Sequence, residues 1–158
     1  MIPADWLPWT DALLTWLHLS AVLGWAVFMT SCTALLRPDW LNGSALQRLQ
    51  LTQRLATGAG AATLLTGVLK ALLGAKGAAW LLGQPLLGFK LLAALAMVVV
   101  CWRAGTPLRR WLARWRSEAR LPPAGEVDRL RQRLLRAAHG MLWVTAAGVL
   151  LSRGLLAL

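Results

Sequence analysis

The chain has 158 residues, of which 58% are apolar and only 15% are charged, against about 25% charged residues in an average soluble domain. This composition excludes an intrinsically disordered chain, which needs low hydrophobicity. No charged residue occurs from Ala12 to Leu36, and that run is longer than the ~20 residues that cross a bilayer. The sequence therefore predicts an integral membrane protein that forms a single transmembrane domain over residues 1–158.

Four apolar segments predict an all-α protein with four membrane spans. They cover residues 10–36, 55–73, 85–102 and 137–155. Before the second span, Ser44-Ala-Leu-Gln47 matches a capping box, which predicts a helix that begins at about Ala45. Small residues four apart in that span, such as Ala56 and Gly60, favour close helix packing. The expected fold is an antiparallel four-helix bundle.

A basic segment follows the third span. Gly105-Thr-Pro107 predicts a break in the helix. Beyond it, the apolar residues of 108–120 fall on one stripe of a helical wheel and the arginines face away from that stripe. The stripe consists of Leu108, Trp111, Leu112, Trp115 and Ala119. This pattern predicts a separate amphipathic helix in the cytoplasmic interface, ended by Pro122-Pro123.

The distribution of basic residues predicts the orientation of the chain. The net charge is +11, and ten of the seventeen basic residues lie between Arg103 and Arg136. By the positive-inside rule, the first and third connections are cytoplasmic. Both termini are then periplasmic in a multi-pass protein of the bacterial inner membrane. Basic residues beside apolar spans favour anionic lipids at the cytoplasmic face as partners, and no motif for nucleic-acid binding is present.

Polar residues within the spans are the candidates for chemistry, because no motif of soluble catalysis occurs. His18 lies roughly 9 Å, and Lys90 roughly 8 Å, below the outer surface at 1.5 Å per residue. Lys70 and Arg153 end their spans on the same side. We expect these four residues to line an outer-leaflet pocket. His18 would ligate the iron of haem b while the basic side chains face its propionates; a quinone or another anionic ligand is the alternative.

Each of these four residues also has an ordinary structural interpretation. Lys90 can extend its stem toward the outer surface. Lys70 and Arg153 can be interfacial anchors. His18 can form a hydrogen bond with a neighbouring helix.

Three further polar residues lie toward the cytoplasmic side. His139 is about 20 Å from His18 along the membrane normal, so we do not expect both histidines to bind one haem. Cys32 and Cys101 share a depth near the cytoplasmic face, where they could be neighbours in the bundle. We expect them to behave as small hydrophobic residues, and a metal or redox role is the alternative. Three tryptophans lie deeper in the spans and pack either a flat cofactor or the bundle itself: Trp16, Trp25 and Trp143.

Several stretches resemble an uncharacterised bacterial family of predicted membrane proteins, domain of unknown function 2214. They are Leu17-His-Leu-Ser-Ala21, Leu36-Arg-Pro38, Gly74-Ala-Lys-Gly-Ala-Ala-Trp-Leu-Leu-Gly83, Pro85-Leu-Leu-Gly-Phe-Lys-Leu91 and Ser152-Arg-Gly154. The resemblance covers nearly the whole chain and implies four helices. It implies no established activity.

A more distant likeness is to the small four-helix membrane protoporphyrinogen oxidases, which carry haem. The pattern from Leu17-His18 to Trp25 is similar to theirs, as is Lys90 in the third helix followed by the basic stretch from Arg103 to Arg116. This resemblance implies that His18 is a haem ligand and that Lys90 acts near the tetrapyrrole.

Taken together, these features predict a haem- or porphyrin-interacting membrane protein of redox type. The alternative is a non-catalytic accessory or assembly subunit of a larger respiratory or photosynthetic membrane complex. In that case the Trp-, Ala- and Gly-rich spans would dock onto partner subunits or onto a second copy of the chain. A transporter or channel is disfavoured, because the spans contain no buried acidic residues.

Overall fold

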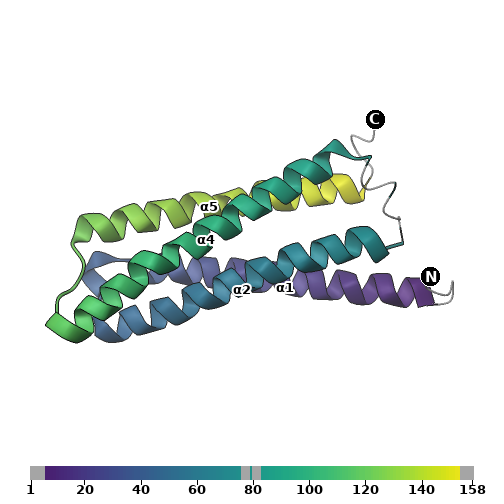
Figure 1. Cartoon of the computed structure of the whole chain (residues 1–158). Helices are drawn as coiled ribbons and strands as arrows, with labels where there is room; N and C mark the ends of the chain where they lie inside the picture. Colours follow the sequence, from purple (N-terminus) through teal and green to yellow (C-terminus); the bar gives the residue numbers. More distant parts are fainter. Residues whose placement is uncertain (1–5, 76–78, 80–82, 154–158) are drawn as a thin grey trace.

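The computed structural model describes residues 6–75, 79 and 83–153. Within them, four long helices alternate in direction (Figure 1): α1 (Leu7–Leu35), α2 (Gly43–Leu73), α4 (Pro85–Glu118) and α5 (Ala124–Ser152). A short 3-10 helix, η2 (Pro38–Trp40), lies between α1 and α2. Consecutive helices pack against each other, and α1 also packs against α5. The predicted all-α, antiparallel four-helix bundle is confirmed.

The start of α2 is fixed by a side-chain cap. The Asn42 Oδ1 accepts a hydrogen bond from the Ala45 backbone N–H at 2.9 Å and another from the Ser44 hydroxyl at 2.7 Å. Asparagine at this position satisfies a backbone donor that the first helical turn leaves free. The helix therefore begins at Gly43, two residues before the predicted start, and Ser44 is not its cap.

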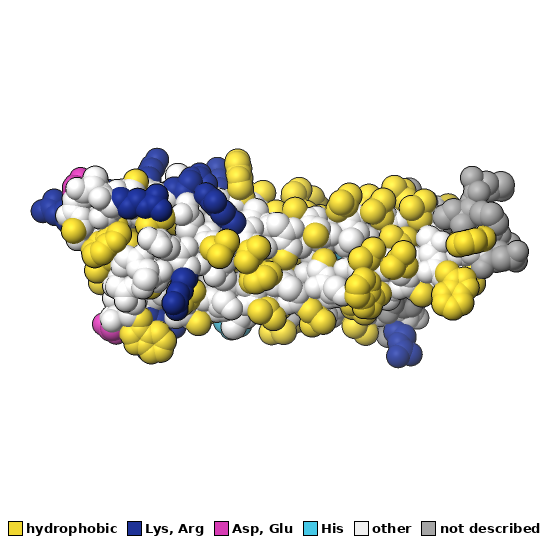
Figure 2. Space-filling model, turned by 90° about the horizontal axis from the view of Figure 1, so that it is seen from below, with side chains coloured by type: hydrophobic (Ala, Val, Ile, Leu, Met, Phe, Trp, Pro, Cys, Tyr) yellow, Lys and Arg dark blue, Asp and Glu magenta, His cyan; other side chains and the backbone are white. Residues whose placement is uncertain are grey.

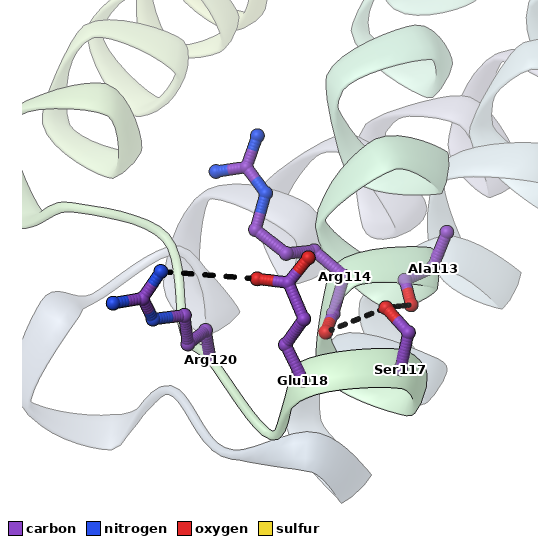
Figure 3. A network of polar contacts seen from close by, with 5 residues as sticks. All are labelled: Ala113, Arg114, Ser117, Glu118 and Arg120. Carbon is purple, nitrogen blue, oxygen red and sulfur yellow. Dashed lines mark hydrogen bonds and ion pairs between the residues drawn. The ribbon is translucent and has the colours of Figure 1, made fainter.

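The turn from α4 to α5 is held by short-range polar contacts (Figure 3). Ala119 adopts a left-handed conformation with φ 52° and donates its N–H to the Trp115 carbonyl at 3.0 Å. The Ser117 hydroxyl lies 3.2 Å from the carbonyl oxygen of Ala113 and 3.4 Å from that of Arg114, and Glu118 pairs with Arg120 at 3.9 Å. Pro122-Pro123 then separates the two helices, as predicted.

Three helices are long and apolar enough to cross a membrane, judged by length and composition: Leu7–Leu35, Gly43–Leu73 and Leu86–Glu118. Helix α5 consists of a basic first half and an apolar second half. Its first half carries four arginines, whereas no Asp, Glu, Lys or Arg occurs from Ala137 to Ser152. This apolar half matches the predicted span over residues 137–155, the last two of which lie outside the described residues. Figure 2 shows hydrophobic side chains along most of the molecule and basic side chains gathered at one end.

We call residues 37–54 and 103–136 the basic end. Helix α4 has 34 residues, hence a length of about 51 Å, whereas the hydrocarbon core of a bilayer is ~30 Å thick. The helices therefore continue beyond the membrane at the basic end. Leucines there, such as Leu46, Leu49 and Leu108, are at most 1% exposed. We call the rest of the bundle the apolar half. There, by contrast, large side chains such as Leu23 and Leu92 are 67% and 70% exposed on the outer surface.

The prediction of a separate interfacial helix over residues 108–120 is wrong, because these residues continue α4 as far as Glu118. The apolar stripe is real, but it faces the other helices: Leu108, Trp111 and Leu112 are 1%, 3% and 4% exposed. Pro107 lies inside α4 and does not break it. A proline costs a helix interior about 3 kcal/mol, and burial of three large apolar side chains contributes about 2 kcal/mol each. Burial in the bundle therefore outweighs the cost of the proline, and the helix continues.

Candidate functional site

His18 of α1 is held in one orientation by α2. Its Nδ1 lies 3.0 Å from the Thr66 Oγ1. The single hydroxyl proton of Thr66 is engaged with the backbone of its own helix, because Oγ1 is 2.7 Å from the Ala62 carbonyl oxygen. This engagement favours Thr66 as the acceptor and Nδ1 as the donor, and the backbone of Thr63 is a second hydrogen-bond partner of the ring. In that tautomer the neutral imidazole presents an unprotonated Nε2.

Lys70 lies one helical turn beyond Thr66 on α2 and also reaches α1. Its ammonium group donates a hydrogen bond to the hydroxyl of Thr15. That hydroxyl in turn donates to the Asp11 carbonyl at 2.7 Å. The side chains of His18 and Lys70 thus each make a polar contact that joins α1 to α2.

Lys90 enters the same region from α4. Its Nζ lies against the backbone of Gly148 in α5, since a Cβ at Gly148 would be 3.0 Å from it. Within the described part of the chain, Lys90 has no hydrogen bond or ion pair. It is half-buried and lies within electrostatic range of both His18 and Lys70. The structure therefore brings these three predicted site residues together, and we call them the His18 cluster.

No acidic side chain among the described residues pairs with the His18 cluster. Asp11 is on the same side of the molecule, but its Oδ1 accepts the backbone N–H of Ala75 at 3.1 Å. The one ion pair in the described ranges joins Glu118 to Arg120 at the opposite end. Basic groups in an apolar bundle need water, a partner or an anionic ligand. The cluster could therefore hold a negatively charged or strongly hydrogen-bond-accepting group.

The fourth predicted site residue, Arg153, stands apart. It follows α5 directly, its side chain is exposed, and its backbone N–H bonds to the Val149 carbonyl at 3.1 Å. No described contact joins its side chain to the His18 cluster. His139 is exposed, and its Nδ1 contacts the Leu135 carbonyl of its own helix at 2.7 Å.

Of the deep tryptophans, one belongs to the bundle. Trp25 is 2% exposed, whereas Trp16 and Trp143 are 64% and 75% exposed on the outer surface. Trp25 packs against Gly60 of α2, where a Cβ would lie 2.9 Å from its ring. Its role in the structure is bundle packing.

Both surface cavities of note lie at the basic end. The larger has a volume of about 310 Å³ and is lined by Arg114, Glu118, Arg120, Leu121 and Pro123. The smaller, about 140 Å³, is lined by Pro107, Trp111, Glu126, Arg129, Leu130 and Arg133. At the His18 cluster the helices pack closely instead: a Cβ at Gly67 would be 3.3 Å from the His18 Cε1. The His18 imidazole therefore packs closely against α2 at Gly67.

Sequence reasoning missed the threonines that position the cluster and one buried amide. Gln53 is 5% exposed, and its Nε2 bonds to the Cys101 carbonyl at 2.8 Å and to the Thr57 hydroxyl at 3.0 Å. This side chain ties α2 to α4. Gln53, Thr63 and Lys70 lie on the same face of α2 as the small residues Ala56 and Gly60. That shared face is the feature of the sequence that pointed to them.

Comparison with known proteins agrees with this architecture. No curated protein and no solved structure gives a significant match to the chain. One family model matches residues 10–155 and carries the description "Predicted membrane protein (DUF2214)". Because that match covers more than nine-tenths of the sequence, the chain belongs to the DUF2214 family of predicted membrane proteins.

Proposed function

We propose that this protein binds a lipid-soluble ligand whose polar edge contacts the His18 cluster, and that it acts in membrane redox chemistry. The observation that carries the proposal is the orientation of His18. The contact with Thr66 favours Nδ1 as the hydrogen-bond donor, and in that tautomer Nε2 would be the base or ligand atom. A histidine held through its other nitrogen is the usual arrangement for a metal-ligating imidazole.

Haem is the first ligand class that this chemistry fits. Nε2 of His18 would hold the iron, and the ammonium groups of Lys70 and Lys90 would face the propionates. Bound haem supplies one-electron chemistry. The chain's own residues supply an oriented base and positive charge in an apolar setting. The likeness to haem-carrying protoporphyrinogen oxidases at His18 and Lys90 supports the same ligand class.

A quinone is the second ligand class within the same proposal. Its carbonyl oxygens accept hydrogen bonds, which Lys90 can donate because no described partner occupies its ammonium group. His18 can accept a proton at Nε2. Both ligand classes are flat and apolar over most of their surface, which suits an approach from lipid past the packed helices.

The distribution of charge supports an orientation for this site. Thirteen of the seventeen basic residues belong to the connections at the basic end, so the positive-inside rule places that end in the cytoplasm. In a bacterial inner membrane the His18 cluster then lies in the outer leaflet, and both termini are periplasmic. The arginines nearest the bilayer would contact anionic lipid head groups.

A non-catalytic subunit of a larger membrane complex is the second candidate. It is favoured by the large apolar side chains on the outer surface, including Trp16 and Trp143 at 64% and 75% exposed. Exposed apolar side chains are expected both at a contact with lipid and at a contact with a partner subunit. Ligand analysis of the purified protein therefore decides between the two candidate functions.

Ligand analysis of the purified protein tests the proposal. The full chain is purified in mild detergent and extracted with organic solvent, and the extract is examined for porphyrins by absorption and for quinones by mass spectrometry. We expect one of these classes in the wild type, and at least tenfold less in His18→Ala and Lys90→Met. His139→Ala, the matched control, keeps the ligand. If neither class is found, or if His18→Ala retains it in full, the proposal is wrong; co-purifying partner chains would then support the subunit alternative.

A further inference from the structure

Three sulfur-containing residues belong to one buried cluster of the core, at a place separate from the His18 cluster. Met29 and Cys32 lie three residues apart on one face of α1, and Cys101 faces them from α4. Each of the three residues is 1% exposed. The Cys101 Sγ lies 2.9 Å from the Met29 Sδ, and Cys32 is within electrostatic range of Cys101. Both cysteines are free thiols and neighbours, as the sequence predicts.

An unpaired hydrogen-bond donor stands beside these sulfur atoms. Trp25 is 2% exposed, and its indole Nε1 has no hydrogen-bond partner among the described residues. The indole is within interaction range of the Cys101 sulfur. A buried donor without an acceptor costs about 1–3 kcal/mol, and such a group in a packed core calls for an explanation. A thiolate at Cys101 would provide the acceptor, because an ionised acceptor forms a stronger hydrogen bond than a neutral one.

The donor set selects a soft metal ion. Thiolate and thioether sulfurs favour monovalent copper, whereas carboxylates and carbonyls favour magnesium and calcium. The described residues hold no group of three or more His, Cys, Asp and Glu side chains, so the sulfur atoms stand without hard ligands. We propose that Met29, Cys32 and Cys101 bind one Cu(I) ion.

Binding requires deprotonation but no change of oxidation state. Each thiol loses its proton to solvent, and each thiolate forms one bond to the ion, as does a lone pair of the Met29 sulfur. Copper enters and stays as Cu(I), so no oxidant or reductant takes part. Bonds of roughly 2.3 Å, the length of a metal–thiolate bond to zinc, need the sulfurs further apart than in the metal-free contact. The flexible methionine side chain can provide that movement.

The complex carries one net negative charge, and its surroundings offset that charge. The Trp25 N–H donates toward Cys101. Arg131 of α5 places its Nε 3.4 Å from the carbonyl oxygen of Thr33, the residue next to Cys32. On α4 the arginines of the basic end begin two residues beyond Cys101, at Arg103. The site therefore lies at the boundary between the apolar half and the basic end, on the side where positive charge is concentrated.

Anaerobic titration with Cu(I) tests this proposal. The reduced full chain in detergent competes with a chromogenic Cu(I) chelator, and loss of the chelator complex reports binding. We expect one equivalent of copper per chain and at least a tenfold weaker affinity in Cys32→Ser, Cys101→Ser and Met29→Leu. Zn²⁺, offered with its own indicator, should bind at least a hundredfold more weakly than Cu(I).

Two variants separate the metal site from general packing. Met97→Leu changes another buried methionine of the same core, 7% exposed, and should keep the wild-type copper affinity. Trp25→Phe removes the indole N–H and should weaken copper binding while helix content by circular dichroism is unchanged. Full copper binding in the Cys32→Ser/Cys101→Ser double variant would overturn the proposal. So would formation of a Cys32–Cys101 disulfide, seen as a loss of two mass units, with no copper retained.

Discussion

At the scale of single residues, the decisive contact joins His18 to Thr66. A threonine hydroxyl has one proton, and here that proton is engaged by the Ala62 carbonyl at 2.7 Å. This arrangement favours the imidazole as the donor in the 3.0 Å contact, and the second nitrogen is then unprotonated. The sequence showed a histidine in an apolar span. Its partner Thr66 lies on a different helix, α2, and could be identified only from the folded bundle.

Replacement of Thr66 tests this assignment. Thr66→Val keeps the shape of the side chain but removes the acceptor, so the His18 ring loses its fixed orientation. We expect a 10–100-fold loss of ligand affinity, the usual effect of removing a group that orients a ligand residue. Thr145→Val is the matched control, because the Thr145 hydroxyl is exposed and bonds only to Met141 of its own helix. Equal affinity in both variants would contradict the assignment.

At the scale of elements, small residues determine how closely α1, α2 and α4 approach. A Cβ at Gly60 would lie 2.9 Å from both the Trp25 ring and a methyl carbon of Val98. Both neighbours are packed side chains of other helices, so neither can move freely. The pair Ala56 and Gly60 was correctly interpreted from the sequence as a packing face, because residues four apart share one side of a helix.

Two glycines of α2 test this packing. Gly60→Ala should lower the free energy of unfolding by about 1–3 kcal/mol through overpacking. Gly58→Ala, where a Cβ would meet nothing within 4 Å, should leave stability unchanged or raise it, since alanine is the better helix former. Thermal unfolding in detergent compares the two variants. An equal shift in both would show that Gly60 is not in contact with Trp25.

The continuity of α4 gives a second prediction at this scale. Leu108→Ala should destabilise the protein by about 2–5 kcal/mol, the cost of truncating a buried leucine, because Leu108 is 1% exposed. Leu92→Ala, on the outer surface of the same helix at 70% exposed, should have a much smaller effect. Unfolding by denaturant in mixed micelles measures both. A small effect of Leu108→Ala would restore the interfacial helix that the sequence predicted.

At the scale of the whole molecule, the bundle is divided into an apolar half and a basic end, and one buried cluster extends from the basic end into the middle of the bundle. The sequence correctly predicted four helices, their order and their apolar segments, because hydropathy and charge decide these features locally. It did not predict that the stripe from Leu108 to Trp115 packs inside the bundle. An amphipathic stripe has the same pattern whether it faces lipid or other helices, and only the positions of α2 and α5 distinguish the two.

The orientation of the bundle follows from its charge and is tested by fusion reporters. We expect a reporter that is active only in the periplasm to be active when it is fused after Leu158. A second fusion in the α4–α5 turn, at Gly125, should be active only with a cytoplasmic reporter. The opposite pattern would invert the topology and place the His18 cluster in the inner leaflet.

The central claim is that the His18 imidazole provides a free ligand atom for a lipid-soluble redox ligand. Titration of the purified chain with haem, followed by absorption, tests this claim most directly. We predict saturable binding near one haem per chain, with a spectrum of histidine-ligated iron that His18→Ala abolishes and His139→Ala preserves. The same spectrum and affinity in wild type and His18→Ala, or no saturable binding in the wild type, would contradict haem as the ligand of this site.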